Sequence, residues 1–215
     1  RMRQWIMRIS AYAKRLLDDL NTLDWTDSIK EAQRNWIGQS QGAEVRFQVA
    51  GMDHQLDVFT TRPDTIYGVS FMVLAPEHPL VEEITTPSQR EAVAKYKHEA
   101  SLKSERERQG AGEQSVTGCD TGAFATHPMT GKKLPIWIAD YVLAGYGTGA
   151  IMAVPAGDER DWKFATHFGL EIPGIFEGKD TAEQVYTEKN ASLCHSETLN
   201  GMNSVEGIPA AIALL

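Results

Sequence analysis

The stretch GTGAIMAVPAGDERDWKFA, residues 147–165, predicts a strand, a turn and the start of a helix in immediate succession. Two glycines permit tight bends, an apolar run extends from Ala150 to Val154, and Pro155 ends it. The polar group that follows is typical of a helix N-terminus, with Asp158 as N-cap and Asp161 in the first turn. Backbone N–H groups and carboxylates gather at such a junction. These aspartates are therefore either helix caps alone or ligands as well.

Length and composition indicate one full domain with an appended arm, because 215 residues with 42% apolar and 23% charged residues are typical of a globular chain. Neither an apolar run of about 18 to 20 residues nor a signal peptide is visible. We therefore expect a cytoplasmic protein without a membrane partner. The net charge of −8 argues against binding of long nucleic acid by a basic face. It leaves room for recognition of one nucleic-acid end in a pocket.

Residues 1–37 are predicted to form a helical connecting arm. Apolar residues recur at helical spacing from Gln4 to Leu20, and a second, short amphipathic helix extends to about Asn35. Gly38 then has the position of a C-cap. One face of the first helix is apolar, so we expect it to pack on another part of a larger protein.

Both ends of the sequence indicate a piece cut from a longer chain. Arg1 stands inside the helical pattern, and the apolar helix that opens at Gly207 stops at Leu215. We expect the main domain at residues 38–200, after the arm, and the truncated start of a return connection at residues 201–215.

From Ala43 the apolar residues alternate with polar ones, which predicts a β-hairpin through Phe59. Its second strand leads into TTRPDT, residues 60–65. Pro63 lacks an N–H donor and restricts Arg62 to extended geometry, so we expect a fixed irregular loop at the strand end. The three threonines supply hydroxyls without charge, either as turn formers or as parts of a site.

The remaining pattern predicts short strands at 67–74, 123–126, 134–138 and 172–176, and helices at 77–84, 88–109 and 158–168. Ser88 and Glu91 have the spacing of a capping box, and Gly169 is expected to cap the last of these helices. Many short strands with a few interspersed helices favour an α+β fold. We expect a small β-barrel-like mixed sheet decorated with helices.

No P-loop, GxGxxG or HExxH motif occurs in the sequence. Cys119 and Cys194 lack CxxC partners, so they predict neither a disulfide framework nor a zinc site. The histidines stand singly and without the spacing of metal ligands: His54, His78, His98, His127, His167 and His195. An enzyme with this sequence would position a water and a substrate and use no obvious nucleophile.

Two segments carry a resemblance to a known family. TTRPDT (60–65) and GTGAIMAVP (147–155) followed by DERD (158–161) resemble the editing domain, or connective polypeptide insertion, of class I leucyl-tRNA synthetases of bacterial type. QRNWIGQSQGAE (33–44) and MVLAPEHPL (72–80) also match that family. The resemblance therefore extends over most of the chain, and its motifs taken together are specific.

The same motifs favour the leucyl family over its relatives. The valyl enzyme usually carries Glu where this chain has Asp64, and the isoleucyl enzyme has a different hexamer. Neither the HIGH nor the KMSKS signature is present, so we expect no aminoacylation site here. Many family members carry histidine directly before the first aspartate, where this chain has Gly157. That departure puts one contact with the tRNA terminus in question and leaves Asp158 and Asp161 in register.

The resemblance implies post-transfer editing, which is hydrolysis of the ester that joins a noncognate amino acid, such as norvaline or isoleucine, to the 3′-terminal adenosine of leucine tRNA. Editing is needed because two amino acids that differ by one methylene differ in their free energy of binding to an apolar pocket by only about 1–3 kcal/mol. The implied partners are the 3′ end of that tRNA and the rest of the synthetase. No cofactor is expected in this domain, whereas the parent enzyme uses ATP and Mg. Alternatives are a degenerate domain that only binds the tRNA end, and valyl or isoleucyl editing.

The resemblance also assigns roles to single residues. Asp161 is implied to hold the α-ammonium of the substrate, and Asp158 is implied to bind the substrate while it keeps its role as helix cap. Thr60 and Thr61 would hold the attacking water or the developing oxyanion, which makes Thr60, Thr61 and Asp161 the catalytic candidates.

The other candidates are implied to bind the substrate. Thr65, with its stiff branched β-carbon, would exclude leucine, and Met152 and Val154 would line the same pocket from one strand face. Arg160 would contact the tRNA end or pair with a nearby carboxylate. The remaining contacts with the terminal phosphate or adenosine are implied for Arg62 and Tyr146.

Overall fold

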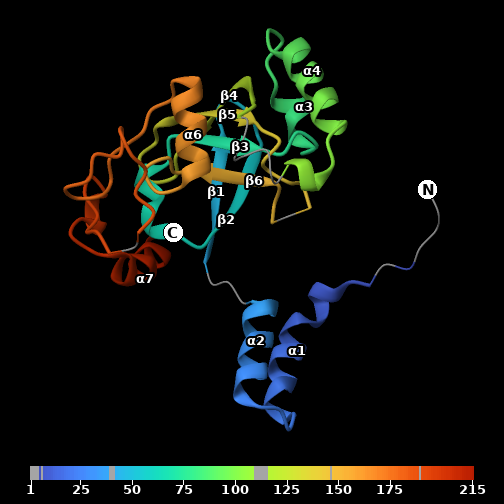
Figure 1. Ribbon diagram of the computed structural model, residues 1–215. Coiled ribbons are helices and arrows are strands. Elements are labelled where there is room, and N and C mark those ends of the chain that lie inside the picture. The colour runs from blue at the N-terminus through green and yellow to red at the C-terminus, as the bar shows by residue number, and fades with distance from the viewer. Residues whose placement is uncertain (1–4, 6, 39–41, 109–115, 146, 189) are drawn as a thin grey trace. The chain divides into compact units, whose positions relative to one another are not determined.

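The computed structural model describes residues 5, 7–38, 42–108, 116–145, 147–188 and 190–215 (Figure 1). The chain divides into two compact units, Arg1–Gln41 and Gly42–Leu215. Each unit is described by itself below. None of the described helices combines the length and the apolar content needed to cross a membrane.

The first unit is a pair of helices that contact each other. The elements are η1 (Ile9–Tyr12), α1 (Ala13–Asp19), η2 (Leu20–Thr22) and α2 (Asp27–Ile37). The prediction of one helix from Gln4 to Leu20 is wrong in detail. Trp5, Met7 and Arg8 are not helical, and 3₁₀ turns flank α1 on both sides. Gly38, at φ +65°, ends α2 as expected and donates its N–H to the carbonyl of Arg34 at 2.9 Å. Large apolar side chains of this unit are exposed, among them Trp5, Leu16 and Trp36.

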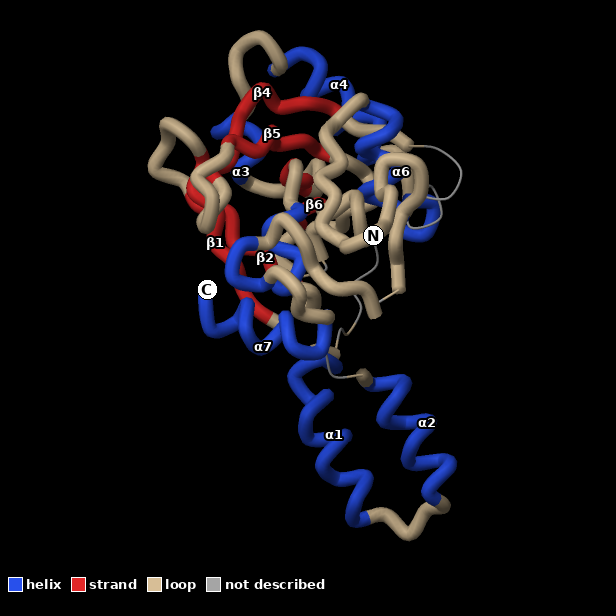
Figure 2. Tube along the Cα trace, turned by 90° about the vertical axis from the view of Figure 1, so that its left-hand side faces the viewer, coloured by secondary structure: helices blue, strands red, loops and turns tan. Residues whose placement is uncertain are grey.

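The second unit is built on a six-stranded mixed sheet. Its strands are β1 (Ala43–Val49), β2 (Gln55–Thr60), β3 (Phe71–Leu74), β4 (Cys119–Thr126), β5 (Lys133–Ile138) and β6 (Ala150–Ala153), in the order β2-β1-β4-β5-β3-β6. β3 and β5 pair in parallel and the other neighbours are antiparallel. β2 and β6, at the two ends of this order, also contact each other, so the sheet curls into a nearly closed barrel (Figure 2). The predicted α+β barrel-like fold is confirmed.

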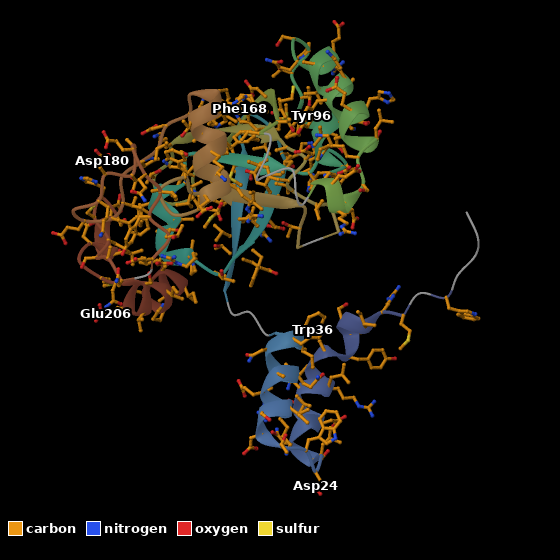
Figure 3. All side chains as sticks on the ribbon, viewed as in Figure 1. Asp24, Trp36, Tyr96, Phe168, Asp180 and Glu206 are labelled. Atoms are coloured by element: carbon orange, nitrogen blue, oxygen red, sulfur yellow. The ribbon has the colours of Figure 1, made fainter. Side chains whose placement is uncertain are left out.

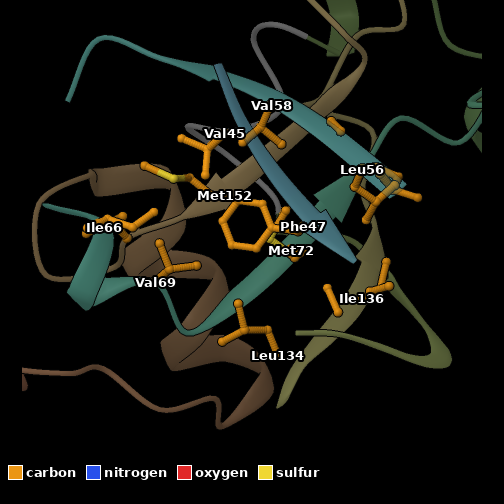
Figure 4. Packing of buried hydrophobic residues seen from close by; sticks show 14 of the residues in the cluster. Val45, Phe47, Leu56, Val58, Ile66, Val69, Met72, Leu134, Ile136 and Met152 are labelled. Carbon is orange, nitrogen blue, oxygen red and sulfur yellow. The ribbon is translucent and has the colours of Figure 1, made fainter. Parts of the chain in front are cut away.

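The barrel interior is filled by one apolar cluster, in which Phe47, Met72 and Met152 approach one another from three strands (Figure 4). β3 is buried on both faces, as a four-residue apolar strand allows. Met72 faces the interior, whereas Phe71 and Val73 belong to a second cluster outside the barrel.

α6 (Glu159–Phe168) covers that second cluster, and Phe164 provides its centre. The Phe164 ring lies 5.3 Å from Phe71 and 5.5 Å from Trp137, centroid to centroid. Asp158 caps the start of α6 through its side chain, and Gly169 ends it at φ +66°, both as predicted. The position of the α6 N-terminus is therefore fixed by packing as well as by its caps.

The other elements are η3 (Pro63–Gly68), α3 (Leu80–Ile84), α4 (Arg90–Ser101), η4 (Glu197–Leu199) and α7 (Ser204–Leu214). The strand predicted from residue 67 begins only at Phe71, because η3 occupies the residues before it. The strand predicted at 172–176 does not form, and a single bridge joins Phe176 to Leu193. Pro173 and Gly174 interrupt that segment, and proline has no N–H for a ladder.

The capping box expected at Ser88 is also wrong. Gln89 is the N-cap of α4, and its side chain makes no capping bond. A capping box forms further along the chain, where Ser104 N donates to Glu107 Oε2 at 2.7 Å and Glu107 N donates to Ser104 Oγ at 3.3 Å. It starts a separate helical turn at 105–108, so α4 ends at Ser101 and not at 109, which itself lies outside the described residues.

Candidate functional site

A polar cavity of about 180 Å³ lies where the two ends of the sheet meet. β2 leads directly into the TTRPDT loop, and β6 leads into the N-terminus of α6, so contact between these strands brings the two segments together. The lining residues are Thr60, Thr61, Arg62, Thr65, Met152, Val154, Gly157, Asp158 and Asp161. The cavity is smaller than the roughly 300–1,000 Å³ of pockets for drug-sized ligands. It suits an amino-acid-sized group.

Asp161 is the buried carboxylate of this cavity, with 6% of its surface exposed. Its Oδ2 accepts from the backbone N–H of Val154 at 2.9 Å, and its Oδ1 accepts from the hydroxyl of Tyr141 at 3.2 Å. Burial, with a smaller contribution from the charge of Asp158, raises the pKa of Asp161 to about 7. A cation entering the cavity would favour the ionised form of this carboxylate.

Asp158 has a different role at the same junction. Its Oδ1 accepts from the backbone N–H of Arg160 at 2.9 Å and of Asp161 at 3.2 Å, which is the geometry of an N-cap. The Asp161 carboxylate makes no such capping bond, because it turns toward Val154 at the end of β6. Of the two aspartates, the structure gives the cap to Asp158 and the buried position to Asp161.

The threonine loop is held by its own backbone. Thr60 Oγ1 accepts from the N–H of Arg62 at 3.0 Å, and the hydroxyl of Thr65 donates to the carbonyl of Arg62 at 2.9 Å. Pro63 at the start of η3 restricts the backbone further. Thr65 is 3% exposed, whereas Thr61 is exposed to solvent. The Thr65 side chain is therefore locked in place and lines the cavity as a fixed wall.

Arg62 makes internal contacts that the sequence did not predict. Its Nε and Nη2 donate to the two oxygens of Asp64, each at 2.9 Å, and Nη2 also donates to Ser204 Oγ at 3.0 Å. Asp64 is fully buried, and Ser204 opens α7. Arg62 lines the cavity while its guanidinium anchors the loop to α7. The Arg-x-Asp spacing was visible in the sequence, but the contact with a residue 142 positions away was not.

The other predicted residues lie as follows. Met152 and Val154 both line the cavity, while Ala153 between them belongs to the outer cluster. Arg160 lies outside the cavity lining, with its Nε 3.7 Å from Asp158 Oδ1. Tyr146 lies outside the described residues.

Gly157, which departs from the pattern that the resemblance implies, lies in the cavity wall. A Cβ at this position would lie 3.5 Å from the Phe176 ring, which is ordinary van der Waals contact. A side chain could therefore start here without a backbone change. Across the described part of the chain, no three His, Cys, Asp or Glu side chains gather in a group that could hold a metal ion.

A nearly closed α+β barrel, with an acidic and threonine-lined cavity at its seam, has the architecture of the editing domains inserted in class I aminoacyl-tRNA synthetases. The comparison with family models shows to which synthetase family the domain belongs. The model described as "Leucyl-tRNA synthetase, editing domain" matches residues 34–215, and the chain belongs to that family.

The chain is also similar to a solved structure, the ternary complex of Agrobacterium radiobacter K84 agnB2 LeuRS with tRNA and LeuAMS. The TM-score is 0.67 and the sequence identity 38% over 84% of this chain. This chain spans 22% of the length of that protein.

Proposed function

We propose that this chain hydrolyses the ester bond of leucine tRNA that carries a noncognate amino acid, such as norvaline or isoleucine. The observation that carries the proposal is the cavity itself. It combines one buried carboxylate, Asp161, with threonine hydroxyls and an apolar wall in a volume suited to an aminoacyl group.

In this proposal Asp161 binds the α-ammonium that every aminoacyl ester carries. Each of its oxygens already accepts one hydrogen bond, which fixes the carboxylate and leaves lone pairs directed at a ligand. A charge-assisted hydrogen bond of this kind contributes roughly 1.5–3 kcal/mol. Because the ammonium is common to all substrates, Asp161 orients the ester and does not choose among side chains.

Selection among side chains falls to other residues of the cavity lining. The Thr65 side chain is held by its bond to the Arg62 carbonyl, so it cannot swing away from a larger substrate. Met152 and Val154 supply apolar contact for smaller or differently branched side chains. Exclusion of leucine by these side chains gives the second sieve that one binding pocket alone does not provide.

Thr60 and Thr61 are proposed to hold the attacking water or the developing oxyanion. The Thr60 oxygen accepts from the Arg62 N–H, which orients the hydroxyl at the cavity edge. Correct positioning of a water and stabilisation of an oxyanion are each worth up to a few kcal/mol. We propose no cofactor for this domain. ATP and Mg would serve the parent synthetase, which residues 1–37 and 201–215 would join to the domain.

The decisive experiment uses the complete synthetase that contains this chain and leucine tRNA charged with norvaline. Wild-type enzyme should release norvaline, and Asp161→Ala should lose this activity while aminoacylation remains. N-acetylated norvalyl-tRNA, which lacks the ammonium, supplies the matched control. If Asp161 anchors the amine, the acetylated substrate is hydrolysed slowly by both enzymes, and the substitution has no further effect on it.

Other outcomes would identify a different function. A strong effect of Asp161→Ala on the acetylated substrate would assign Asp161 to proton transfer. Binding of the tRNA end without hydrolysis would indicate the degenerate alternative, for which Gly157 in place of histidine is the one observation in favour. Preferential hydrolysis of misacylated valine or isoleucine tRNA would indicate the related editing domains.

A further inference from the structure

A side chain outside the cavity lining holds the carboxylate at the centre of the proposed site. The hydroxyl of Tyr141 donates to Asp161 Oδ1 at 3.2 Å, while the Val154 N–H occupies Oδ2. We propose that Tyr141 is a positioning residue for the amine-binding carboxylate, a role that rests on the proposed function of Asp161. It orients Asp161 and does not touch the substrate.

The backbone on both sides of Tyr141 is fixed by one guanidinium. Arg108 is 5% exposed; its Nε donates to the carbonyl of Asp140 and its Nη2 to the carbonyl of Val142, each at 2.8 Å. Glu77 holds Arg108 in turn through an ion pair of 2.6 Å. A buried arginine that binds the carbonyls before and after a single residue leaves the backbone of that residue little freedom.

Asp140 adds two more restraints to the same turn. Its carboxylate pairs with Lys103 Nζ at 2.6 Å, and its N–H donates to the hydroxyl of Tyr96 at 2.9 Å. Tyr96 lies on α4 (Figure 3). α4 and the segment that follows it therefore hold the turn that presents Tyr141 to Asp161.

The Tyr141 ring is also constrained. It meets Phe164 of α6 in an edge arrangement with centroids 5.9 Å apart, and the guanidinium carbon of Arg160 lies 5.9 Å from the ring centroid. Burial, followed by the charge of Asp161, raises the pKa of Tyr141 well above its usual range. The hydroxyl therefore stays protonated, and remains a donor, throughout the range in which Asp161 titrates.

The hydrogen bond should act on Asp161 in a definite direction. Burial and Asp158 raise the pKa of Asp161, whereas the Val154 N–H, Arg160 and the Tyr141 hydroxyl oppose that increase. On the facing loop, Arg62 is already paired with Asp64. Loss of the Tyr141 hydroxyl would therefore free Oδ1 to rotate and favour the protonated acid, which holds an ammonium less well.

The test is Tyr141→Phe, which keeps the ring that packs on Phe164 and removes only the hydroxyl. Tyr67→Phe is the matched control, because Tyr67 donates to a different carboxylate, Glu197, at 3.3 Å. Carbon-13 NMR of the carboxyl groups should show the Asp161 titration about half to one pH unit higher in Tyr141→Phe than in wild type and in the control. An unchanged titration would overturn the inference.

The complete synthetase provides the second measurement. Tyr141→Phe should lower kcat/KM for norvalyl-tRNA by roughly 3–10-fold and move the acidic limb of its pH profile upward. Its rate on the N-acetylated substrate should stay at the wild-type value. An equal loss on both substrates would mean a purely structural effect and would reject the inference. An inactive wild type would instead overturn the proposed function, and with it the role of Tyr141 in the reaction.

Discussion

The charge on Asp161 should lower the stability of the folded domain at neutral and alkaline pH. Asp161→Asn removes this charge and should therefore raise the stability under those conditions. Burial raises the pKa of this carboxyl from its ordinary 3.8 to about 7 in the folded state. Between these two values the folded protein holds a proton that the unfolded chain has released, so stability falls as pH rises through this window. At about 1.4 kcal/mol per pH unit, the effect reaches on the order of 4 kcal/mol above about pH 8.

The asparagine has nearly the same shape and can accept from the Val154 N–H, so the buried geometry is preserved while the titrating charge is removed. Urea unfolding followed by circular dichroism would give the free energy of unfolding of both proteins at about pH 4 and about pH 8.5. We expect the advantage of the variant to grow by about 2–4 kcal/mol between these conditions. For a chain of this size that corresponds to roughly 5–15 °C in Tm.

The pH dependence of this difference is the critical result, since any substitution can alter stability by a constant amount. Asp53→Asn, at an exposed position of the β1–β2 turn, is the matched control for loss of a carboxylate outside the cavity. A difference between Asp161→Asn and wild type that is the same at both pH values would refute the assignment of a raised pKa to Asp161.

Three further substitutions address the rest of the cavity. Thr65→Ala should open the wall and raise hydrolysis of correctly charged leucyl-tRNA by roughly 10–200-fold, measured as release of leucine; continued protection would show that another residue excludes leucine. Asp64→Asn should lower the free energy of unfolding in urea by on the order of 3 kcal/mol, because it leaves the Arg62 cation without its buried partner; an unchanged midpoint would contradict this. Gly157→Ala should fit, since its Cβ meets Phe176 at normal contact distance, and should change stability by less than about 1 kcal/mol. A large loss in urea unfolding would show that the backbone at residue 157 has no such room.

Local sequence rules succeeded where local contacts decide the structure. The N-cap at Asp158 and the C-cap at Gly169 depend on backbone groups within a few residues, and both formed as predicted. The alternating hairpin of β1 and β2 formed for the same reason, since its register is set by neighbouring residues.

The capping boxes show where such rules stop. Ser-x-x-Glu occurs at both Ser88 and Ser104, but only the second forms the reciprocal bonds. Thr86, two residues before Ser88, is tied to β4, because both its N–H and its hydroxyl donate to the carbonyl of Thr121. The Ser88 hydroxyl lies 3.2 Å from that of Thr86 and not at the helix start. A tertiary contact 35 residues away thus displaced a local preference.

The same distinction separates the two aspartates of the site. Sequence spacing is sufficient to make Asp158 a cap, but the burial of Asp161 depends on Tyr141 and on closure of the barrel at β6, which no local pattern encodes. A buried carboxylate that holds its proton up to about pH 7 is unfavourable for stability. An ammonium in the cavity reverses this effect, because it offers the ionised form a partner that water no longer supplies. Selectivity for a cationic ligand and low stability of the empty site therefore have one physical cause, and a substitution that removes one should remove the other.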